Sequence, residues 1–97
     1  MFRVGNNSRR FRNVVGPQIA AVRESLGWKQ KDLEAKLQLA NLDFSRVTVA
    51  RIENRMRSVY DYELQIIAGV LRVSPEELLP PAEKTKDELD ELKSGYC

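Results

Sequence analysis

The chain has 97 residues, enough for one small domain with short tails and too few for a second hydrophobic core. Hydrophobic residues make up 42% of the sequence and charged residues 31%, which is a globular composition. No apolar run approaches the roughly 18 to 20 residues that a bilayer requires, and no hydrophobic stretch follows the first arginines, so we expect a soluble protein without a targeting segment.

The sequence contains no His, and its one Cys is the last residue, Cys97. Neither an intrachain disulfide nor a Cys/His zinc cluster can form, and the commonest general base is missing. We therefore expect a cytoplasmic protein that is not an enzyme and that uses neither a cofactor nor a metal.

Positive charge is concentrated in the first part of the chain. Residues 1–57 hold twelve Lys and Arg against five Asp and Glu, whereas residues 58–97 hold four against nine. A basic half is expected where one face meets a polyanion, because phosphate binding releases counterions from nucleic acid. An unevenly charged, solvated surface would give the same pattern, so this feature alone leaves both readings open.

Apolar residues recur with helical spacing in the first half of the chain. A Gly-Pro pair precedes the first run of helically spaced apolar residues, and Gly27 ends this run, which predicts a helix over 17–26. Leu33 and Leu37 predict a second helix that begins at residue 29 or 30 and ends near residue 40.

The third predicted helix is short. The residues after the second helix break its period, and Ser45 is a good N-cap for a helix over 45–54. Val49 and Ile52 would face inward on this helix. A basic loop without periodicity follows, over 54–59.

A fourth, strongly apolar helix is expected to begin at Tyr60 or Asp61, with Ser58 as a usable cap. A short fifth helix is predicted after Ser74, because Glu77 can bond back to the N–H of that serine, and it should end at a Pro-Pro pair.

The charged last segment is predicted to be a frayed helix or disordered, with Thr85 and Glu88 as a possible capping box. The chain therefore predicts an all-α fold of five helices, without any strand pattern. We expect a basic arm over 1–15, a domain over 16–80 and a charged tail over 81–97.

The order of these features carries a family resemblance. Gln30 opens the second helix and Leu33 follows it, and the third helix ends in the sequence RIENR at residues 51–55. The sequences DYEL and LRVS then lead to ELL at residues 77–79. Residues 17–79 thus resemble the lambda-repressor-like, XRE-type helix-turn-helix domain, which implies a compact five-helix fold with the helix-turn-helix at the second and third helices.

Two features depart from the family pattern. Residues 41–45 lengthen the turn between the second and third helices. Glu34 stands where the family normally has an alanine that lets these helices touch, and the nearest small residue is Ala35. Either the longer turn lets the second helix rotate slightly, or Glu34 lies at the rim of the contact.

The resemblance implies that the third helix reads bases through Arg46, Val47 and Arg51, with Thr48 beside them. Arginine presents a planar fork that matches guanine O6 and N7, and a valine can pack on a thymine methyl. The two arginines could instead contact phosphate or solvent, and Val47 could be partly buried in the core.

Gln30 lies where free N–H groups and the dipole of the second helix favour a phosphate, with an ordinary surface glutamine as the alternative. Phosphate contacts are also expected from residues that flank the third helix, with a solvated basic loop as the alternative: Lys29, Ser45, Asn54, Arg55 and Arg57.

A structural role is implied for Arg23 and Glu53, because in the family an arginine of the first helix pairs with the glutamate that ends the third. We expect a partly buried, bidentate pair. Trp28 is expected to pack between the first two helices rather than to contact DNA sugars. The arm could follow the DNA backbone or remain disordered.

These features predict a sequence-specific regulator of transcription that binds double-stranded DNA and represses by occupying a promoter. One copy buries too little surface for useful specificity, so a homodimer through the fourth and fifth helices is expected on an inverted repeat. The alternative is a protein-interaction adaptor or antitoxin-like partner protein, in which the acidic half binds a protein and DNA binding is secondary.

Overall fold

The computed structural model describes residues 10–95, and every regular element within them is a helix. This range contains seven helices rather than the predicted five, because the tail forms two short helices of its own. The helices are α1 (Gly16–Ser25), α2 (Gln30–Leu39), α3 (Arg46–Glu53), α4 (Asp61–Leu71), α5 (Pro75–Leu78), α6 (Ala82–Asp87) and α7 (Leu89–Gly95). The all-α fold is confirmed.

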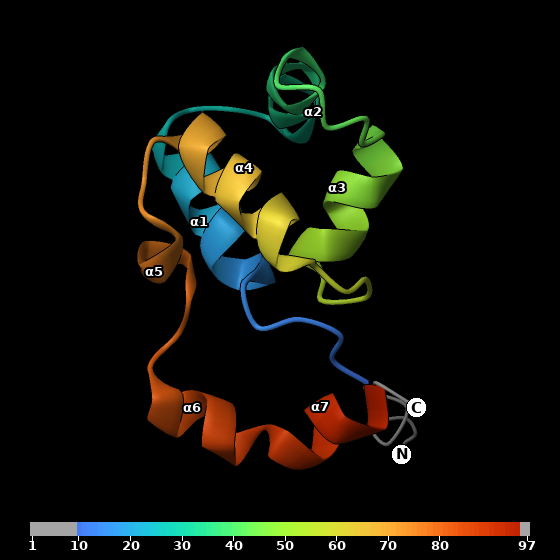
Figure 1. Ribbon diagram of the computed structural model, residues 1–97, viewed down its shortest axis with the longest axis vertical. Coiled ribbons are helices and arrows are strands. Elements are labelled where there is room, and N and C mark those ends of the chain that lie inside the picture. Colours follow the sequence, from blue (N-terminus) through green and yellow to red (C-terminus); the bar gives the residue numbers. More distant parts are fainter. Residues whose placement is uncertain (1–9, 96–97) are drawn as a thin grey trace.

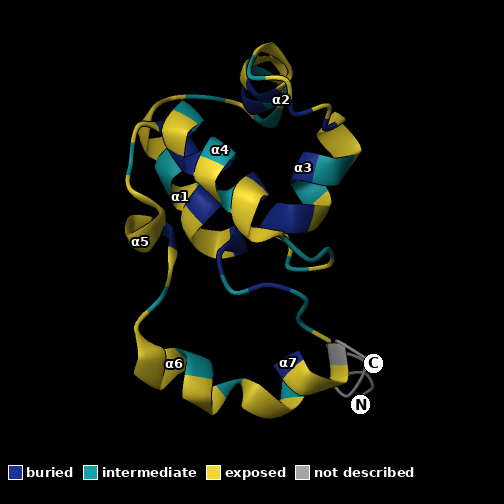
Figure 2. Cartoon of the chain, in the orientation of Figure 1, coloured by how far each residue is buried: buried dark blue, intermediate teal, exposed yellow. Residues whose placement is uncertain are grey.

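The first four helices enclose one hydrophobic core, and α5 packs against α1 and α4 (Figure 1). Figure 2 shows buried residues on the sides of these helices that face one another. Leu64, Ile66 and Val70 of α4 are partly buried against this core, so the bundle covers much of that helix's apolar surface. The buried core residues are Val15, Ile19, Leu33, Leu37, Leu42, Phe44, Val49, Ile52, Ile67, Ala68, Leu71 and Leu78.

Local signals place most helix ends within one residue of their predicted positions. Gly27 follows α1 with a φ of +76°, in the left-handed region that glycine adopts without strain. The hydroxyl of Ser45 accepts the backbone N–H of Thr48 at the start of α3. The carboxylate of Glu77 accepts the N–H of Ser74, which closes the first turn of α5.

The start of α4 differs from the prediction that Ser58 would cap it. Tyr60 is the N-cap, and the carboxylate of Glu63 accepts its backbone N–H over 3.0 Å. Ser58 lies two residues further upstream, where its carbonyl oxygen accepts a hydrogen bond from Arg57. The acidic residue in the first turn, rather than a serine before it, therefore closes this helix end.

The lengthened turn between α2 and α3 is an ordered part of the core. Leu42 and Phe44 are buried, and Asn41 adopts a positive φ of 68° that turns the chain after α2. The side-chain amide of Gln38 donates to the carbonyl oxygen of Phe44 over 3.1 Å. The extra residues thus add two apolar side chains beneath the helix pair.

The residues before α1 are fixed to the far end of α3. Asn13 is buried, and its side-chain nitrogen donates to the carbonyl oxygens of Ile52 and Arg57 at 3.0 and 2.8 Å. Its side-chain oxygen accepts the N–H of Gly16 at 2.9 Å. A Cβ on Gly16 would collide with the carbonyl oxygen of Ile52, so only glycine permits this close approach.

The tail helices lie beneath the bundle in Figure 1. Thr85 and Glu88 do not form the predicted capping box, because Thr85 lies inside α6 and the Glu88 carboxylate pairs with Arg55. Leu92 of α7 is only 6% exposed, so part of the tail is packed rather than solvated. No helix within residues 10–95 combines the length and apolar character needed to cross a membrane.

Candidate nucleic-acid interface

Helix α3 buries one side and presents the other to solvent. Val49, Ile52 and Glu53 are buried, whereas Arg46 and Arg51 are exposed. Within residues 10–95, neither exposed guanidinium has an ion pair or hydrogen bond, so both are available to an outside partner. This is the orientation that base reading requires.

Two further predicted base-reading residues lie on the same helix. Val47 is 62% exposed, which excludes its burial in the core of the free protein. Thr48 is half-buried, and its hydroxyl lies 3.2 Å from the hydroxyl of Ser45. The outward surface of α3 therefore combines two unpaired guanidinium groups with the methyl groups of Val47 and the hydroxyl of Thr48.

Arg23 and Glu53 form the bidentate ion pair that the family resemblance implies. Arg23 donates through Nε and Nη2 to the two carboxylate oxygens of Glu53, over 2.7 and 3.1 Å, and these side chains are 10% and 5% exposed. The hydrogen bonds to Glu53 raise the pKa of Arg23 against the opposing effect of burial. The pair joins the last turn of α1 to the last residue of α3.

The same ion pair is extended toward α2. Arg23 also donates to the carbonyl oxygen of Trp28 over 2.7 Å, and the side-chain amide of Gln30 donates to Glu53 over 2.9 Å. The side-chain amide of Gln30 is therefore bonded within the protein. The backbone N–H of Gln30, at the start of α2, is left for an outside partner. Trp28 packs against the core, as predicted, and the Lys36 ammonium lies 4.8 Å from its ring centre.

A basic pocket lies between the starts of α2 and α3. Its volume is about 420 Å³. Lys29 and Lys31 contribute exposed ammonium groups, and Arg46 contributes its guanidinium from α3. Because helix N-termini favour anions, this pocket can receive a phosphate next to the outward surface of α3. Its lining residues are Arg23, Trp28, Lys29, Gln30, Lys31 and Arg46.

Glu34 resolves the departure from the family pattern. Its carboxylate lies at the rim of the α2–α3 contact and accepts the backbone N–H of Arg46 over 3.0 Å. Ser45 accepts the N–H of Thr48 at the same helix end. The hydroxyl predicted to bind phosphate therefore serves first as a cap, and α3 begins with two of its free N–H groups already occupied.

The predicted phosphate ligands beyond α3 differ in whether their side chains are already paired within the protein. Asn54 is exposed at the C-cap of α3. Arg55 and Arg57 are not free, because each guanidinium makes a bidentate pair with a glutamate. Neither pairing follows from the local sequence pattern, and in the free protein carboxylates already occupy both guanidinium groups.

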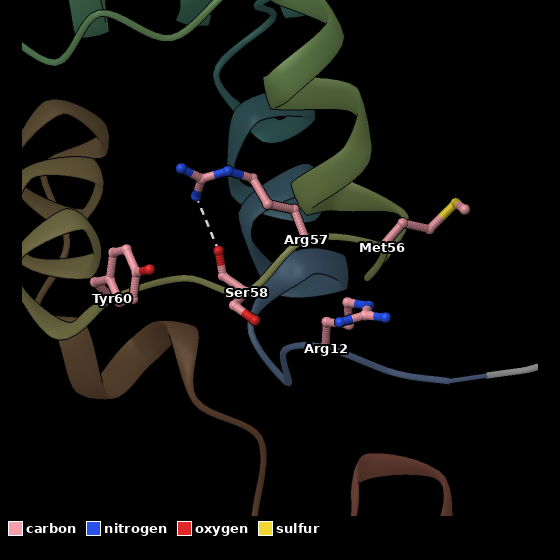
Figure 3. Close-up of a pocket in the computed structure, with 5 residues that line it drawn as sticks. All are labelled: Arg12, Met56, Arg57, Ser58 and Tyr60. Atoms are coloured by element: carbon pink, nitrogen blue, oxygen red, sulfur yellow. Dashed lines mark hydrogen bonds between the residues drawn. The ribbon is translucent and has the colours of Figure 1, made fainter. Parts of the chain in front are cut away.

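Arg57 also lines a second open pocket, of about 470 Å³ (Figure 3). Arg57 points toward α4, where the Glu63 carboxylate accepts hydrogen bonds from both of its terminal nitrogens, over 2.9 and 3.1 Å. Arg12, which the sequence places in the basic arm, lines the pocket, and its backbone N–H donates to the carbonyl oxygen of Arg55 over 3.0 Å. The pocket lining is completed by Met56, Ser58 and Tyr60.

Within the described residues, no group of three or more His, Cys, Asp or Glu side chains is placed to hold a metal ion. The chemistry of the surface is that of unpaired guanidinium and ammonium groups around an exposed helix. Such groups can bind anions and base edges.

Comparison with known proteins gives one match. Residues 19–78 match the family model described as helix-turn-helix, of the XRE and lambda-repressor-like type. The matched segment begins within α1 and ends at the last residue of α5, so it contains the whole α2–α3 unit. No curated protein and no solved structure matches the chain.

Proposed function

Because the family model covers more than half of its residues, this chain belongs to the helix-turn-helix family of DNA-binding regulators, and we propose that it is a sequence-specific transcriptional repressor. The observation that carries the proposal is the outward surface of α3, where two unpaired arginines flank an exposed valine. In this proposal α3 enters the major groove of double-stranded DNA.

The dimensions of α3 suit this placement. An α-helix with its side chains is about 10 to 12 Å across, which fits the roughly 12 Å width of the major groove. Arg46 and Arg51 are five residues apart, so they project about 140° apart around the helix axis. A groove surrounds the helix on two sides and can meet both, with each guanidinium forming two hydrogen bonds to a guanine and Val47 packing on a thymine methyl.

Phosphates would be held on either side of the reading helix. Lys29, Lys31 and the backbone N–H of Gln30 line the pocket beside the start of α3, and Asn54 stands at its other end. Such contacts set the position of the protein on the duplex without reading its sequence. Glu53 bonds to Arg23 of α1 and to Gln30 of α2, and these contacts hold α3 in place relative to the phosphate-binding side chains.

A single copy presents a small reading surface, so the proposed repressor binds as a homodimer through α4 and α5. Three exposed apolar side chains near these helices support this choice. Tyr60 and Tyr62 stack with ring centres 5.8 Å apart at the start of α4, and Leu79 follows α5. Sedimentation of the free protein against the DNA complex tests the stoichiometry.

Selection of bound duplexes from a random pool tests the reading role directly. We expect recovered duplexes to share a motif with guanines in each half-site, and Arg46→Ala and Arg51→Ala each to weaken binding by about 1 to 3 kcal/mol and to relax preference at one position. Glu83→Ala, an exposed change on α6, is the matched control. A pool recovered without any motif contradicts the proposal and favours the protein-interaction adaptor.

A further inference from the structure

One arginine joins three parts of the chain that are far apart in sequence. The guanidinium of Arg55, in the loop after α3, pairs with Glu88 at 2.6 and 3.1 Å. Its Nε donates to the carbonyl oxygen of Asn13 over 3.0 Å, and its guanidinium carbon lies 3.7 Å from the centre of the Phe11 ring. The N-terminal segment, the α3–α4 loop and the tail therefore meet at this side chain.

Between residues 10 and 95, few other contacts attach the tail to the bundle. Helices α6 and α7 pack mainly against each other, and in Figure 1 they lie below the four-helix core. Leu92 is buried but does not belong to the central core cluster. The hydrogen bonds from Arg55 lower the pKa of Glu88 against the opposing effect of burial, so the carboxylate stays ionised. The Arg55–Glu88 pair is thus a principal anchor of the tail.

The anchor has the chemistry of a phosphate contact. A guanidinium fork binds a carboxylate and a phosphate in the same bidentate manner. Arg55 directly follows Asn54, the C-cap of the helix proposed to enter the groove. The tail over 82–95 carries five acidic and three basic side chains, so it brings net negative charge to this end of the DNA-facing helix.

We infer that Glu88 acts as an intramolecular latch, occupying in the free protein a guanidinium of Arg55 that a DNA phosphate takes over in the complex. Binding then exchanges one anion for another on the same fork and releases the α6–α7 tail from the α3–α4 loop. The latch lowers affinity for every duplex equally, because phosphates carry no base identity. The inference rests on the proposed DNA-binding function.

Substitution of Glu88 tests the latch in the full chain. Glu88→Gln removes the charge that competes with DNA, while Asp87→Asn removes an equal charge from the neighbouring, exposed residue. On a duplex selected by the wild-type protein, we expect Glu88→Gln to bind about fivefold more tightly than Asp87→Asn, the size of shift that a part-exposed ion pair supplies. Equal affinities of the two variants overturn the latch.

A double-mutant cycle separates the latch from general repulsion between the tail and DNA. In an Arg55→Ala background, Glu88→Gln has no guanidinium to release, so its gain in affinity should disappear. Arg55→Ala should also reduce the dependence of log affinity on log salt by about one phosphate contact. A gain that persists undiminished without Arg55 contradicts the inference.

Hydrogen exchange distinguishes failure of the latch from failure of the proposed function. The N–H of Leu92 donates to the carbonyl oxygen of Glu88 over 3.0 Å, so exchange at α7 reports whether the tail is folded in place. We expect saturating duplex to accelerate exchange at α7 of the wild-type protein, and Glu88→Gln to accelerate it without DNA. Tight DNA binding with unchanged α7 exchange overturns the latch alone, whereas absence of binding to any duplex overturns the proposed function as well.

Discussion

Glu34 of α2 and Arg46 of α3 are joined by a hydrogen bond from the backbone N–H of the arginine to the carboxylate of the glutamate, over 3.0 Å. A small residue at position 34 would let α2 and α3 touch. Glu34 instead joins the two helices through a hydrogen bond. It also places a negative charge at the positive end of the α3 dipole, which stabilises the helix.

Removal of this link should weaken the start of α3. We expect Glu34→Ala to lower the free energy of unfolding by about 1 kcal/mol, the usual contribution of a carboxylate at a helix N-terminus. Urea denaturation measures the change. Asp43→Ala removes an equal charge from an exposed position in the segment before α3 and should have a smaller effect. Equal losses in the two variants would show that the Glu34 link contributes nothing specific.

The buried amide of Asn13 gives a second prediction. Asn13→Asp keeps the size of the side chain but loses the two hydrogen bonds donated to the carbonyl oxygens of Ile52 and Arg57. A carboxylate would then face two buried acceptors, so we expect a loss of about 2 to 3 kcal/mol in unfolding free energy. Thermal unfolding at neutral pH measures it. Gln18→Glu, the same amide-to-acid change on the exposed side of α1, should cost far less.

The elements that the sequence predicts correctly are those governed by local spacing. The ends of α1, α2 and α3 follow from helical periodicity together with Gly27 and Ser45, whose backbone and capping preferences act within a few residues. The exposed side of α3 follows for the same reason, since Val49 and Ile52 fix which side is buried.

The features that the sequence does not predict depend on contacts across the fold. Arg55 and Glu88 are 33 positions apart, and Asn13 reaches the end of α3 across 39 residues. No local period specifies such pairs, so the sequence alone places Asn13 in the basic arm and predicts a phosphate contact or a solvated loop for Arg55. Phe44 became a core residue because the tertiary fold, rather than its irregular turn, supplies its neighbours.

The buried Arg23–Glu53 pair predicts that one isosteric substitution will strongly lower the free energy of unfolding. Glu53→Gln preserves shape but leaves the buried guanidinium of Arg23 without a counter-charge, which should cost about 3 to 5 kcal/mol. Because a small domain has little stability to lose, this variant can unfold outright. Replacement of both partners, Arg23→Met with Glu53→Leu, should recover much of the loss, as measured by urea midpoints. A double variant no more stable than Glu53→Gln would contradict this account.

The ion pair between Arg57 and Glu63 predicts how stability depends on pH. Burial favours the neutral form of Glu63, but the hydrogen bonds from Arg57 and from the N–H of Tyr60 outweigh it and hold the pKa of Glu63 below its usual 4.5. The folded state then binds a proton less readily than the unfolded state. The stabilisation is therefore complete above pH 4.5 and is lost as the pH falls through the lowered pKa; Glu88 acts in the same direction.

Thermal unfolding between neutral and acidic pH measures this dependence. Glu63→Gln should be less stable than wild type by about 2 kcal/mol at neutral pH, and the difference should shrink on acidification below pH 4.5 because the wild-type carboxylate becomes protonated. Glu76→Gln removes an exposed carboxylate in the first turn of α5 and should leave the pH profile close to that of the wild type. A difference between Glu63→Gln and wild type that stays constant with pH would show that the variant acts through packing and not through the charge of Glu63.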